Sequence, residues 1–308
     1  MLTNILTTGN QVMILLVLLG VGFLCGKLQI FDDASITHLS SFVFKIVAPC
    51  AIVDSFRRPF DMAMFHTMLL VAGIALAYYI VAAVLAQAFI RNGEEATKRV
   101  LQFGVVFGNC GYMGLPLQQV LFGDYGVFCG AVFIAIYNLV QWTYGLLLIS
   151  GDKKQISARR LLNPGIAGVF AGMVIFFFSL ELPALIGGPV TYLAGLNVPV
   201  PMVISGYFLS KADLRSIWRH ASYYKTIALR LIVLPLLGIL AFSLTEWNTE
   251  LLSCCVIDIA VPVAAATTML STLYRQDSET SANLVSVSTI LSMATLPLMV
   301  GLMQSLRG

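Results

Sequence analysis

The chain has 308 residues, of which 58% are hydrophobic and 11% are charged, and its mean hydropathy is +0.89. Since soluble domains carry about 25% charged residues, this composition excludes an ordinary soluble protein and indicates an integral membrane protein. The net charge is only +3. The sequence contains neither a long basic stretch nor a P-loop, which argues against nucleic-acid binding and against an ATP-driven pump.

Ten apolar runs of about 18 residues or more predict ten transmembrane helices. The connections between them are short, so no soluble domain fits, and we expect an all-α fold that forms one membrane domain. No basic segment precedes the first run, so we interpret it as a retained span and not as a cleaved signal peptide. The predicted spans are 10–27, 37–56, 64–90, 99–121, 126–150, 164–181, 189–209, 224–244, 250–274 and 281–305.

The distribution of basic residues predicts which side of the membrane each connection faces. With the N-terminus outside, the cytoplasmic side holds many more lysines and arginines than the outer side, which is the positive-inside bias. We therefore expect a multi-pass protein of the cell (inner or plasma) membrane with both termini on the non-cytoplasmic side. The cytoplasmic residues are Lys27, Arg91, Lys98, Arg99, Lys153, Lys154, Arg159, Arg160, Lys211, Arg215, Arg219, Lys225 and Arg275, and the outer ones are Arg57, Arg58 and Arg307.

The second span contains two charged residues that need an explanation. Lys45 lies well inside the run, and the favoured interpretation is that its long stem carries the ammonium group to the cytoplasmic interface. The alternative is an inward position against an anionic group. Asp54 lies near the outer end beside Arg57 and Arg58, where a surface cluster is the favoured interpretation.

The fourth span is interrupted by GNCGYMGLP, from Gly108 to Pro116. A helix in lipid must satisfy its backbone internally, so a break is tolerated only where the freed groups meet protein, water or a ligand. Such breaks mark binding sites in secondary transporters. The half-helix that follows presents free N–H groups suited to a carboxylate, and Asn109 adds an amide. Ligand contact is the favoured interpretation, and structural kinking is the alternative.

The fifth span carries a polar stripe in IAIYNLVQWTYG. Tyr137, Asn138 and Gln141 fall on one helical face by their spacing. The stripe can line a cavity or hold helices together, and the sequence favours neither. The six cysteines show no metal-ligand spacing, so we predict no metal site and no cofactor.

The eighth and ninth spans carry the remaining ionisable residues. Arg230 lies near the cytoplasmic start of its span, and as for Lys45 the favoured interpretation is that it reaches the interface. Span 9 breaks at AVPVAAATT, from Ala260 to Thr268. Asp258 precedes this break, and an intramembrane carboxylate is a functional candidate by default. It could bind a proton or a cation, pair with Lys45 or Arg230, or lie in the outer headgroup region.

The interruptions are spaced as in a duplicated unit. The basic loop Gly151 to Arg160 lies near the midpoint, with five predicted spans on each side. An odd number of spans per half makes any repeat inverted, so we predict one five-helix repeat at 1–155 and a second at 156–308. In the sequence, Pro49 and Pro199 are 150 positions apart, and Pro116 and Pro262 are 146 apart.

Several of these segments together resemble the auxin efflux carrier family, which includes plant auxin carriers and bacterial dicarboxylate permeases. FGNCGYMGLPL is similar to the family's fourth-span signature, with Asn109 seven residues before Pro116. FKIVAPCAIVDSF, VPMVISGYFLS, RLIVLPL and AVPVAAATTMLSTLYRQD resemble the segments of spans 2, 7, 8 and 9, so the resemblance runs nearly end to end.

The resemblance implies two inverted five-helix repeats, an architecture related to sodium/proton antiporters and bile-acid transporters, in which broken helices 4 and 9 cross at mid-membrane. It implies alternating access and organic-anion substrates such as malate, malonate or indole-acetate. The central loop is short, as in bacterial members, and no residue indicates an indole-sized pocket. We therefore do not expect auxin to be the physiological substrate.

The sequence thus predicts a secondary active transporter or facilitator of small carboxylates in the lipid bilayer, and not an enzyme. The alternative is a membrane sensor or assembly protein that transports nothing. Asp258 is the candidate for proton or sodium coupling, while the substrate, the direction of transport and the oligomeric state, including a homodimer, are left open. The predicted substrate-binding residues are Asn109, Gly111, Met113, Gly114, Pro116, Tyr137, Asn138, Gln141, Pro262 and Thr267.

Overall fold

The computed structural model describes residue 14 and residues 17–151, 164–211 and 221–307, and nearly all of them are helical. The start of the first predicted span, most of the central basic loop and the connection after Lys211 lie outside these residues. Within the described part, six helices are long and apolar enough to cross a membrane, and Val17–Lys27 and Pro164–Phe177 are shorter apolar helices. The ten-span, inverted-repeat arrangement stays a prediction. The six helices are Asp33–Ser55, Met62–Phe89, Cys110–Ser150, Ala184–Lys211, Tyr223–Ser243 and Ser278–Leu306.

The sequence predicts a short loop between spans 4 and 5, but the structure connects the two helical segments with a single non-helical residue. Helix α6 (Leu115–Val140) consists of two helical segments that meet at a kink within the expected gap between 121 and 126, where Gly123 has a non-helical φ of 56° and ψ of −141°. Glycine adopts this left-handed φ without steric cost, so one residue redirects the chain where several were expected.

Wide π turns accompany prolines inside the apolar helices. Proline lacks an N–H, and its ring clashes with the carbonyl four residues before it. A π turn, with its longer hydrogen-bonded loop, is one way for a helix to absorb that disruption without ending. Another π turn, η3 (Gln141–Gly145), has no following proline. The turns that end two residues before a proline are η1 (Val43–Val47) before Pro49, η2 (Cys110–Gly114) before Pro116, and η7 (Leu229–Val233) before Pro235.

The helices form two units, and each unit takes segments from both sequence halves. The described residues of unit 1 come from 1–70, 111–135 and 162–211, and those of unit 2 come from 71–110, 136–161 and 212–308. Unit 1 thus holds predicted spans 1, 2, 6 and 7, and unit 2 holds most of spans 3, 8, 9 and 10. Spans 4 and 5 contribute to both units.

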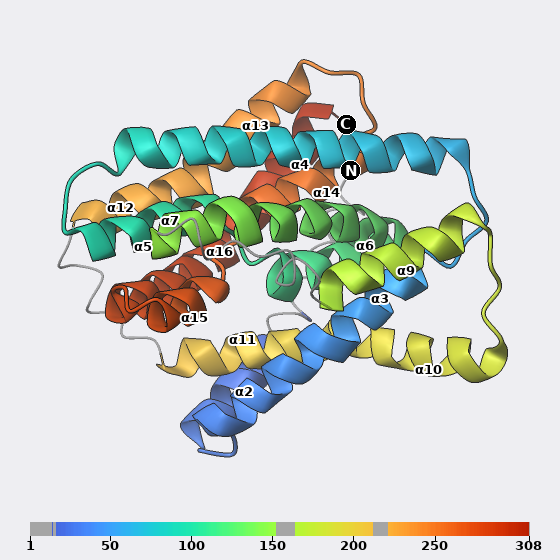
Figure 1. The fold of residues 1–308 in the computed structure, drawn as a ribbon, viewed down its shortest axis with the longest axis horizontal. Coiled ribbons are helices and arrows are strands. Elements are labelled where there is room, and N and C mark those ends of the chain that lie inside the picture. Colours follow the sequence, from blue (N-terminus) through green and yellow to red (C-terminus); the bar gives the residue numbers. More distant parts are fainter. Residues whose placement is uncertain (1–13, 15–16, 152–163, 212–220, 308) are drawn as a thin grey trace. The chain divides into compact units, whose positions relative to one another are not determined.

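In unit 1, the apolar helix α3 (Ala48–Ser55) packs against α9 (Pro164–Phe177) and α10 (Ala184–Ala194) (Figure 1). Helix α11 (Pro199–Lys211) follows the 3-10 turn η5 (Gly195–Asn197) and packs against α2 (Asp33–Phe42). The buried core of this part consists of Ile36, Val43, Val47, Ile204 and Tyr207.

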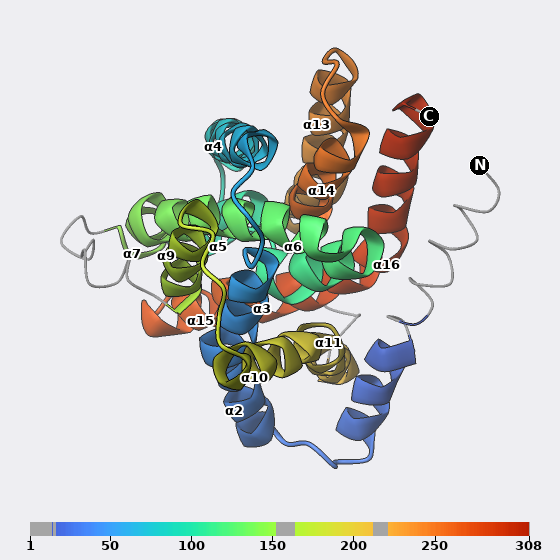
Figure 2. The ribbon, with the colours of Figure 1, turned by 90° about the vertical axis from the view of Figure 1, so that its right-hand side faces the viewer.

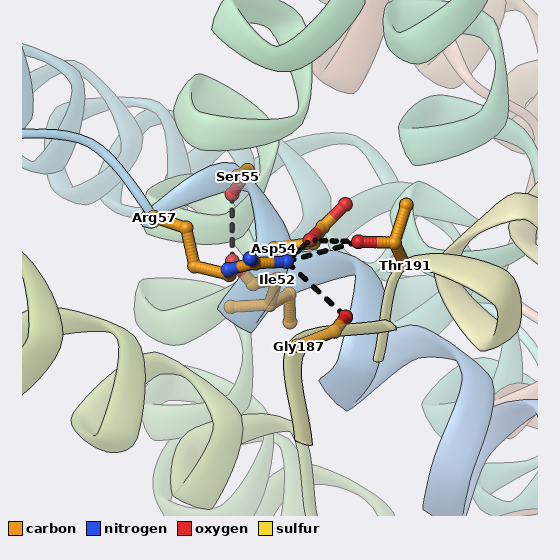
Figure 3. Close-up of polar contacts among 6 residues, drawn as sticks. All are labelled: Ile52, Asp54, Ser55, Arg57, Gly187 and Thr191. Atoms are coloured by element: carbon orange, nitrogen blue, oxygen red, sulfur yellow. Dashed lines mark hydrogen bonds and ion pairs between the residues drawn. The ribbon is translucent and has the colours of Figure 1, made fainter. Parts of the chain in front are cut away.

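A polar cluster joins α3 to α10 at the predicted outer end of unit 1 (Figure 3). Arg57 Nη1 donates to Asp54 Oδ1 at 2.7 Å, to Thr191 Oγ1 at 2.9 Å and to the Gly187 carbonyl at 3.3 Å. Thr191 Oγ1 also donates to Asp54 Oδ1 at 2.9 Å. The predicted partnership of Asp54 with Arg57 is confirmed, whereas Arg58 Nε donates to the Ser55 carbonyl at 2.9 Å.

Replacing Arg57 with alanine is expected to lower stability only slightly. The side chains of Arg57 and Asp54 are 29% and 22% exposed, and a solvent-screened ion pair contributes about 0.2–1 kcal/mol. Thermal unfolding of the purified protein measures the loss, with Arg57→Lys as a control that keeps the charge. A destabilisation comparable to that of a fully buried arginine would contradict this assignment.

Unit 2 contains α4 (Met62–Phe89) from residue 71 onward, α7 (Leu146–Ser150) and the helices around the second interruption. Figure 2 shows α13 (Leu234–Ser243), α14 (Thr249–Ala260) and α16 (Ser278–Arg307) side by side, and all three contact one another. Helix α5 (Glu95–Val106) packs against α12 (Ala221–Ala228) and α16.

The first turn of α5 carries an exposed charge cluster. Glu95 accepts hydrogen bonds from Lys98 and Arg99, and these contacts hold the pKa of the Glu95 carboxyl below its usual value. The cluster is solvent-screened, so it orients side chains at the end of the helix and contributes little to stability.

Candidate functional site

The interruption of span 4 is shorter than the sequence predicts. Helix α5 ends at Val106, residues 107–109 leave the helix, and η2 begins at Cys110. Gly111 and Gly114 are therefore helical, and so is Pro116, the second residue of α6. The predicted break from Gly108 to Pro116 is wrong at its C-terminal end, because the π turn lets the helix continue through the proline.

The interruption of span 9 is also narrower than predicted. Helix α14 ends at Ala260, and Val261 is extended, with φ −60° and ψ 152°. Helix α15 (Ala266–Leu273) then begins, so Thr267 and Thr268 are helical and do not belong to the break.

The two interruptions pair with each other through their backbones, entirely within unit 2. Gly108 and Val263 form an antiparallel bridge. Asn109 N–H donates to the Pro262 carbonyl at 2.8 Å, and Ala264 N–H donates to the Phe107 carbonyl at 3.0 Å. Broken helices can persist in an apolar surrounding only if the freed groups find partners. Here each break supplies hydrogen-bond partners to the other, as the predicted crossing of spans 4 and 9 requires. We call this pairing of residues 107–110 with 261–264 the crossover.

A fully buried arginine lies at the crossover. Arg230, from η7, is 0% exposed. Its Nε donates to the Val261 carbonyl at 2.9 Å, and its Nη2 donates to the Asp258 carbonyl at 3.3 Å. Its Nη1 contacts the Tyr78 hydroxyl and lies 3.4 Å from the Val106 carbonyl. One guanidinium therefore serves carbonyls at the C-terminal ends of both α5 and α14.

The favoured interpretation that Arg230 reaches the membrane interface is wrong. The last carbonyls of a helix have no intrahelical donor, and they carry the partial negative charge of the helix dipole. Two such ends meet beside Arg230 and provide the acceptors that an arginine otherwise finds in water. Lys45 differs, because it belongs to unit 1 and its side chain is exposed; the interface interpretation stays a prediction for it.

Gly108 allows the guanidinium to approach the backbone closely. A Cβ atom at this position would overlap Nη2 of Arg230, would meet its Cζ, and would lie 2.8 Å from Cγ2 of Val261. The first glycine of GNCGYMGLP is therefore required by the space that Arg230 and Val261 fill.

Asp258 is 1% exposed and lies in the last turn of α14. Its backbone carbonyl accepts from Arg230 and is approached at 3.6 Å by Cys110 Sγ. Of the alternatives for its carboxyl group, ion coupling and a charge pair with Arg230 both fit such a buried position, whereas Lys45 is exposed and belongs to unit 1.

The other predicted residues of unit 2 are buried or half-buried. Tyr137 packs edge-on against Phe107, with ring centroids 5.7 Å apart and an interplanar angle of 89°. Asn138 and Gln141 are buried, and Asn109 is half-buried. Gln141 Oε1 and Thr267 Oγ1 are enclosed with no hydrogen-bond partner among the described residues. Buried polar atoms are normally satisfied, so these two atoms are available to water or to a polar ligand.

Four predicted residues, Gly111, Met113, Gly114 and Pro116, belong to unit 1, in η2 and the first turn of α6. Met113 is half-buried, whereas Gly114 and Pro116 are buried. A Cβ atom at Gly111 would meet no atom within 4 Å, so this glycine is not required for close packing within the structure.

Sequence reasoning missed three contributors to the crossover. Tyr78 holds the guanidinium of Arg230 and donates to the Val106 carbonyl at 3.3 Å, and Ser288 Oγ accepts from Val263 N–H at 3.1 Å. The third is Arg230 itself. The signal for it was its charge in an apolar run, which is costly without buried partners. Nothing in the local sequence identifies Tyr78 or Ser288.

Comparisons with known proteins place the chain among membrane transport proteins. A family model described as "Membrane transport protein" matches residues 8–160 and 153–300. The chain is 23% identical to a protein of Rhizobium meliloti named "Putative malonate transporter", over 90% of each chain. It is 24% and 26% identical to proteins named as uncharacterized transporters from Methanothermobacter thermautotrophicus and Methanocaldococcus jannaschii, over 94% of this chain and 96% of each relative.

Proposed function

Because the chain belongs to the membrane transport protein family, as the match over most of its length shows, we propose that it is a secondary transporter of small organic anions. The family match confirms the resemblance to the auxin efflux carriers. Together with the six apolar helices, it makes the chain a multi-pass membrane transporter. The substrate class and the mechanism are our proposal.

The observation that carries the proposal is the backbone pairing of two interrupted spans at Gly108 and Val263. Secondary transporters bind substrates and coupling ions where discontinuous helices meet. A protein that needed only a rigid helical bundle would gain nothing from breaking two spans at matching places.

Three features support a small carboxylate as the substrate. One relative carries the name of a malonate transporter. Gln141 and Thr267 offer buried polar atoms to a guest, and the half-helices after the breaks begin with N–H groups that favour anions. In unit 2 we assign substrate contact to Asn109, Tyr137, Asn138, Gln141, Pro262 and Thr267, and we retain Gly111, Met113, Gly114 and Pro116 as candidates on the adjoining segment of the chain.

Alternating access needs two parts of the protein that can change their arrangement. The division follows the predicted repeat in part: spans 1 and 2 share unit 1 with their counterparts 6 and 7, whereas spans 4 and 5 contribute to both units and their counterparts 9 and 10 belong to unit 2. We propose that the two units are these parts, in two inverted repeats of five spans. The charge distribution favours a cell inner membrane with both termini outside.

Uptake of labelled malonate, malate and monocarboxylates into proteoliposomes tests this function. Replacing Asn109 with alanine is expected to lower uptake efficiency by about tenfold or more, because a hydrogen bond to a charged group contributes about 1.5–3 kcal/mol. Pro116→Ala removes the proline that the π turn accommodates, and it is expected to alter uptake as well.

Asn92→Ala is the matched control, since Asn92 is exposed in the connection before α5, and it is expected to transport like the unaltered protein. Unchanged uptake in Asn109→Ala and Pro116→Ala would argue against the assigned site. Specific binding of an acid without any uptake would favour the non-transporting sensor instead.

A further inference from the structure

Three backbone carbonyls at and beside the crossover surround one positive charge. The carbonyls of Val106, Asp258 and Val261 come from the ends of two half-helices, and all three accept from the guanidinium of Arg230. All of these residues belong to unit 2, so the arrangement is complete within one unit.

Such a group of carbonyls has the chemistry of a cation site. Unwound backbone carbonyls and half-helix C-terminal ends coordinate Na⁺ in secondary transporters with discontinuous helices. Carbonyl oxygens are hard ligands, and the dipoles of two helices direct negative potential toward the same place. A cation is therefore expected where these ends meet, either bound from solution or supplied by the chain.

We propose that Arg230 is this cation. It occupies the place that a coupling Na⁺ would take, so no Na⁺ binds at the crossover and transport requires none. Because this guanidinium is part of the chain, the crossover has its cation without binding one from solution. This inference rests on the proposed transport function, and it states that this function does not depend on Na⁺.

Two neighbours hold the guanidinium in place. The Tyr78 hydroxyl contacts Arg230 and also donates to the Val106 carbonyl, while Gly108 leaves the space that the guanidinium fills. Withdrawal of the side chain would remove the Arg230 donor from three buried carbonyls, leaving only Tyr78 on Val106 and the weak Cys110 Sγ contact on Asp258, which is costly in an apolar surrounding. Asp258 remains the only proposed coupling group at the crossover. Because the proposal excludes Na⁺ there, the ion that Asp258 would bind is a proton.

The first test is thermal unfolding of the unaltered protein in NaCl, KCl and N-methyl-D-glucamine chloride at equal ionic strength. A cation that binds only the folded state raises the unfolding midpoint with its concentration. We expect the same midpoint in all three salts. A midpoint that rises specifically with Na⁺, and that loses this rise when Arg230 is replaced, would overturn the proposal.

The second test empties the position. Arg230→Ala is expected to unfold at a lower temperature, and millimolar guanidinium or Na⁺ is expected to restore part of the loss by binding the bared carbonyls. Arg99→Ala is the control, because Arg99 makes an exposed contact with Glu95 at 3.1 Å and should gain nothing from either ion. If Arg230→Ala does not fold, Arg230→Lys serves in its place, with a smaller loss expected because it keeps the charge.

If guanidinium raises the unfolding midpoints of Arg230→Ala and Arg99→Ala equally, the proposal that Arg230 is a resident cation is contradicted. Uptake assays with Na⁺ replaced separate this inference from the proposed function. Uptake that strictly requires Na⁺ would overturn the inference and leave the transporter assignment standing. Absence of uptake of any acid in every salt would count against the assignment, and the unfolding experiments would still decide the role of Arg230.

Discussion

Replacing Gly108 with alanine is expected to abolish transport and to destabilise the protein. The added Cβ would overlap the Arg230 guanidinium and crowd Val261. The backbone cannot simply move away, because Gly108 is paired with Val263 and its neighbours form the flanking hydrogen bonds. Overpacking of this kind costs about 1–3 kcal/mol, and relief by displacement would separate the two interrupted spans. Proteoliposome uptake and thermal unfolding measure the two effects.

Gly73→Ala is the matched control for this substitution. Gly73 is an exposed glycine inside α4, and a Cβ atom there meets nothing within 4 Å. Alanine is the better helix former, so uptake and stability should be equal to or slightly above those of the unaltered protein. Equal behaviour of the two variants would mean that the close approach at Gly108 has no functional importance.

Replacing Arg230 with methionine is expected to cause the largest loss of stability among the substitutions considered. Methionine fills part of the volume but donates no hydrogen bond, so three carbonyls lose the charged donor that Arg230 supplies, and Val106 and Asp258 keep only Tyr78 and the weak Cys110 Sγ contact. A hydrogen bond to a charged group contributes about 1.5–3 kcal/mol, so the loss of three predicts a destabilisation of roughly 3 kcal/mol or more. Thermal and denaturant unfolding in detergent check the value, and uptake should fall in parallel.

Lys45→Met provides the comparison, because Lys45 is the other cation inside a predicted span and its side chain is exposed. That variant is expected to remain close to the unaltered protein in both stability and uptake. A small loss in Arg230→Met, similar to that in Lys45→Met, would show that the buried contacts of Arg230 contribute little.

The apolar runs predicted the helices well, because in a membrane protein a long apolar run has few alternatives to a helix. The positions of the breaks were predicted less accurately. Sequence patterns treat Pro116 as a helix breaker, whereas the structure absorbs it with the π turn at Cys110–Gly114 and breaks the helix earlier, at residues 107–109. Composition cannot distinguish these outcomes, because both place glycine and proline in the same short segment.

The arginine of the crossover shows what local sequence could not predict. A charge about six residues into an apolar run can reach an interface or find buried partners, and both outcomes occur. The partners of Arg230 are backbone carbonyls at residues 106, 258 and 261, and backbone acceptors leave no mark in side-chain composition. Only the tertiary pairing of the two breaks brings those carbonyls together.

Asp258 was identified as a candidate by its depth in a predicted span, and the structure shows that it is buried. Its role could not be decided from the sequence, because a proton carrier and a charge partner need the same residue in the same place. The proposed role of Arg230 as the resident cation, and not the environment of Asp258 itself, is what limits the ions that we propose for coupling.

The most direct test of the account is gradient-driven uptake of labelled malonate by proteoliposomes, with Na⁺ replaced throughout by N-methyl-D-glucamine, comparing the unaltered protein with Gly108→Ala. We predict accumulation by the unaltered protein without Na⁺ and none by Gly108→Ala, while Gly73→Ala accumulates normally. Equal accumulation by the unaltered protein and Gly108→Ala would contradict the claim that the paired interruptions of spans 4 and 9 form the working centre of a carboxylate transporter.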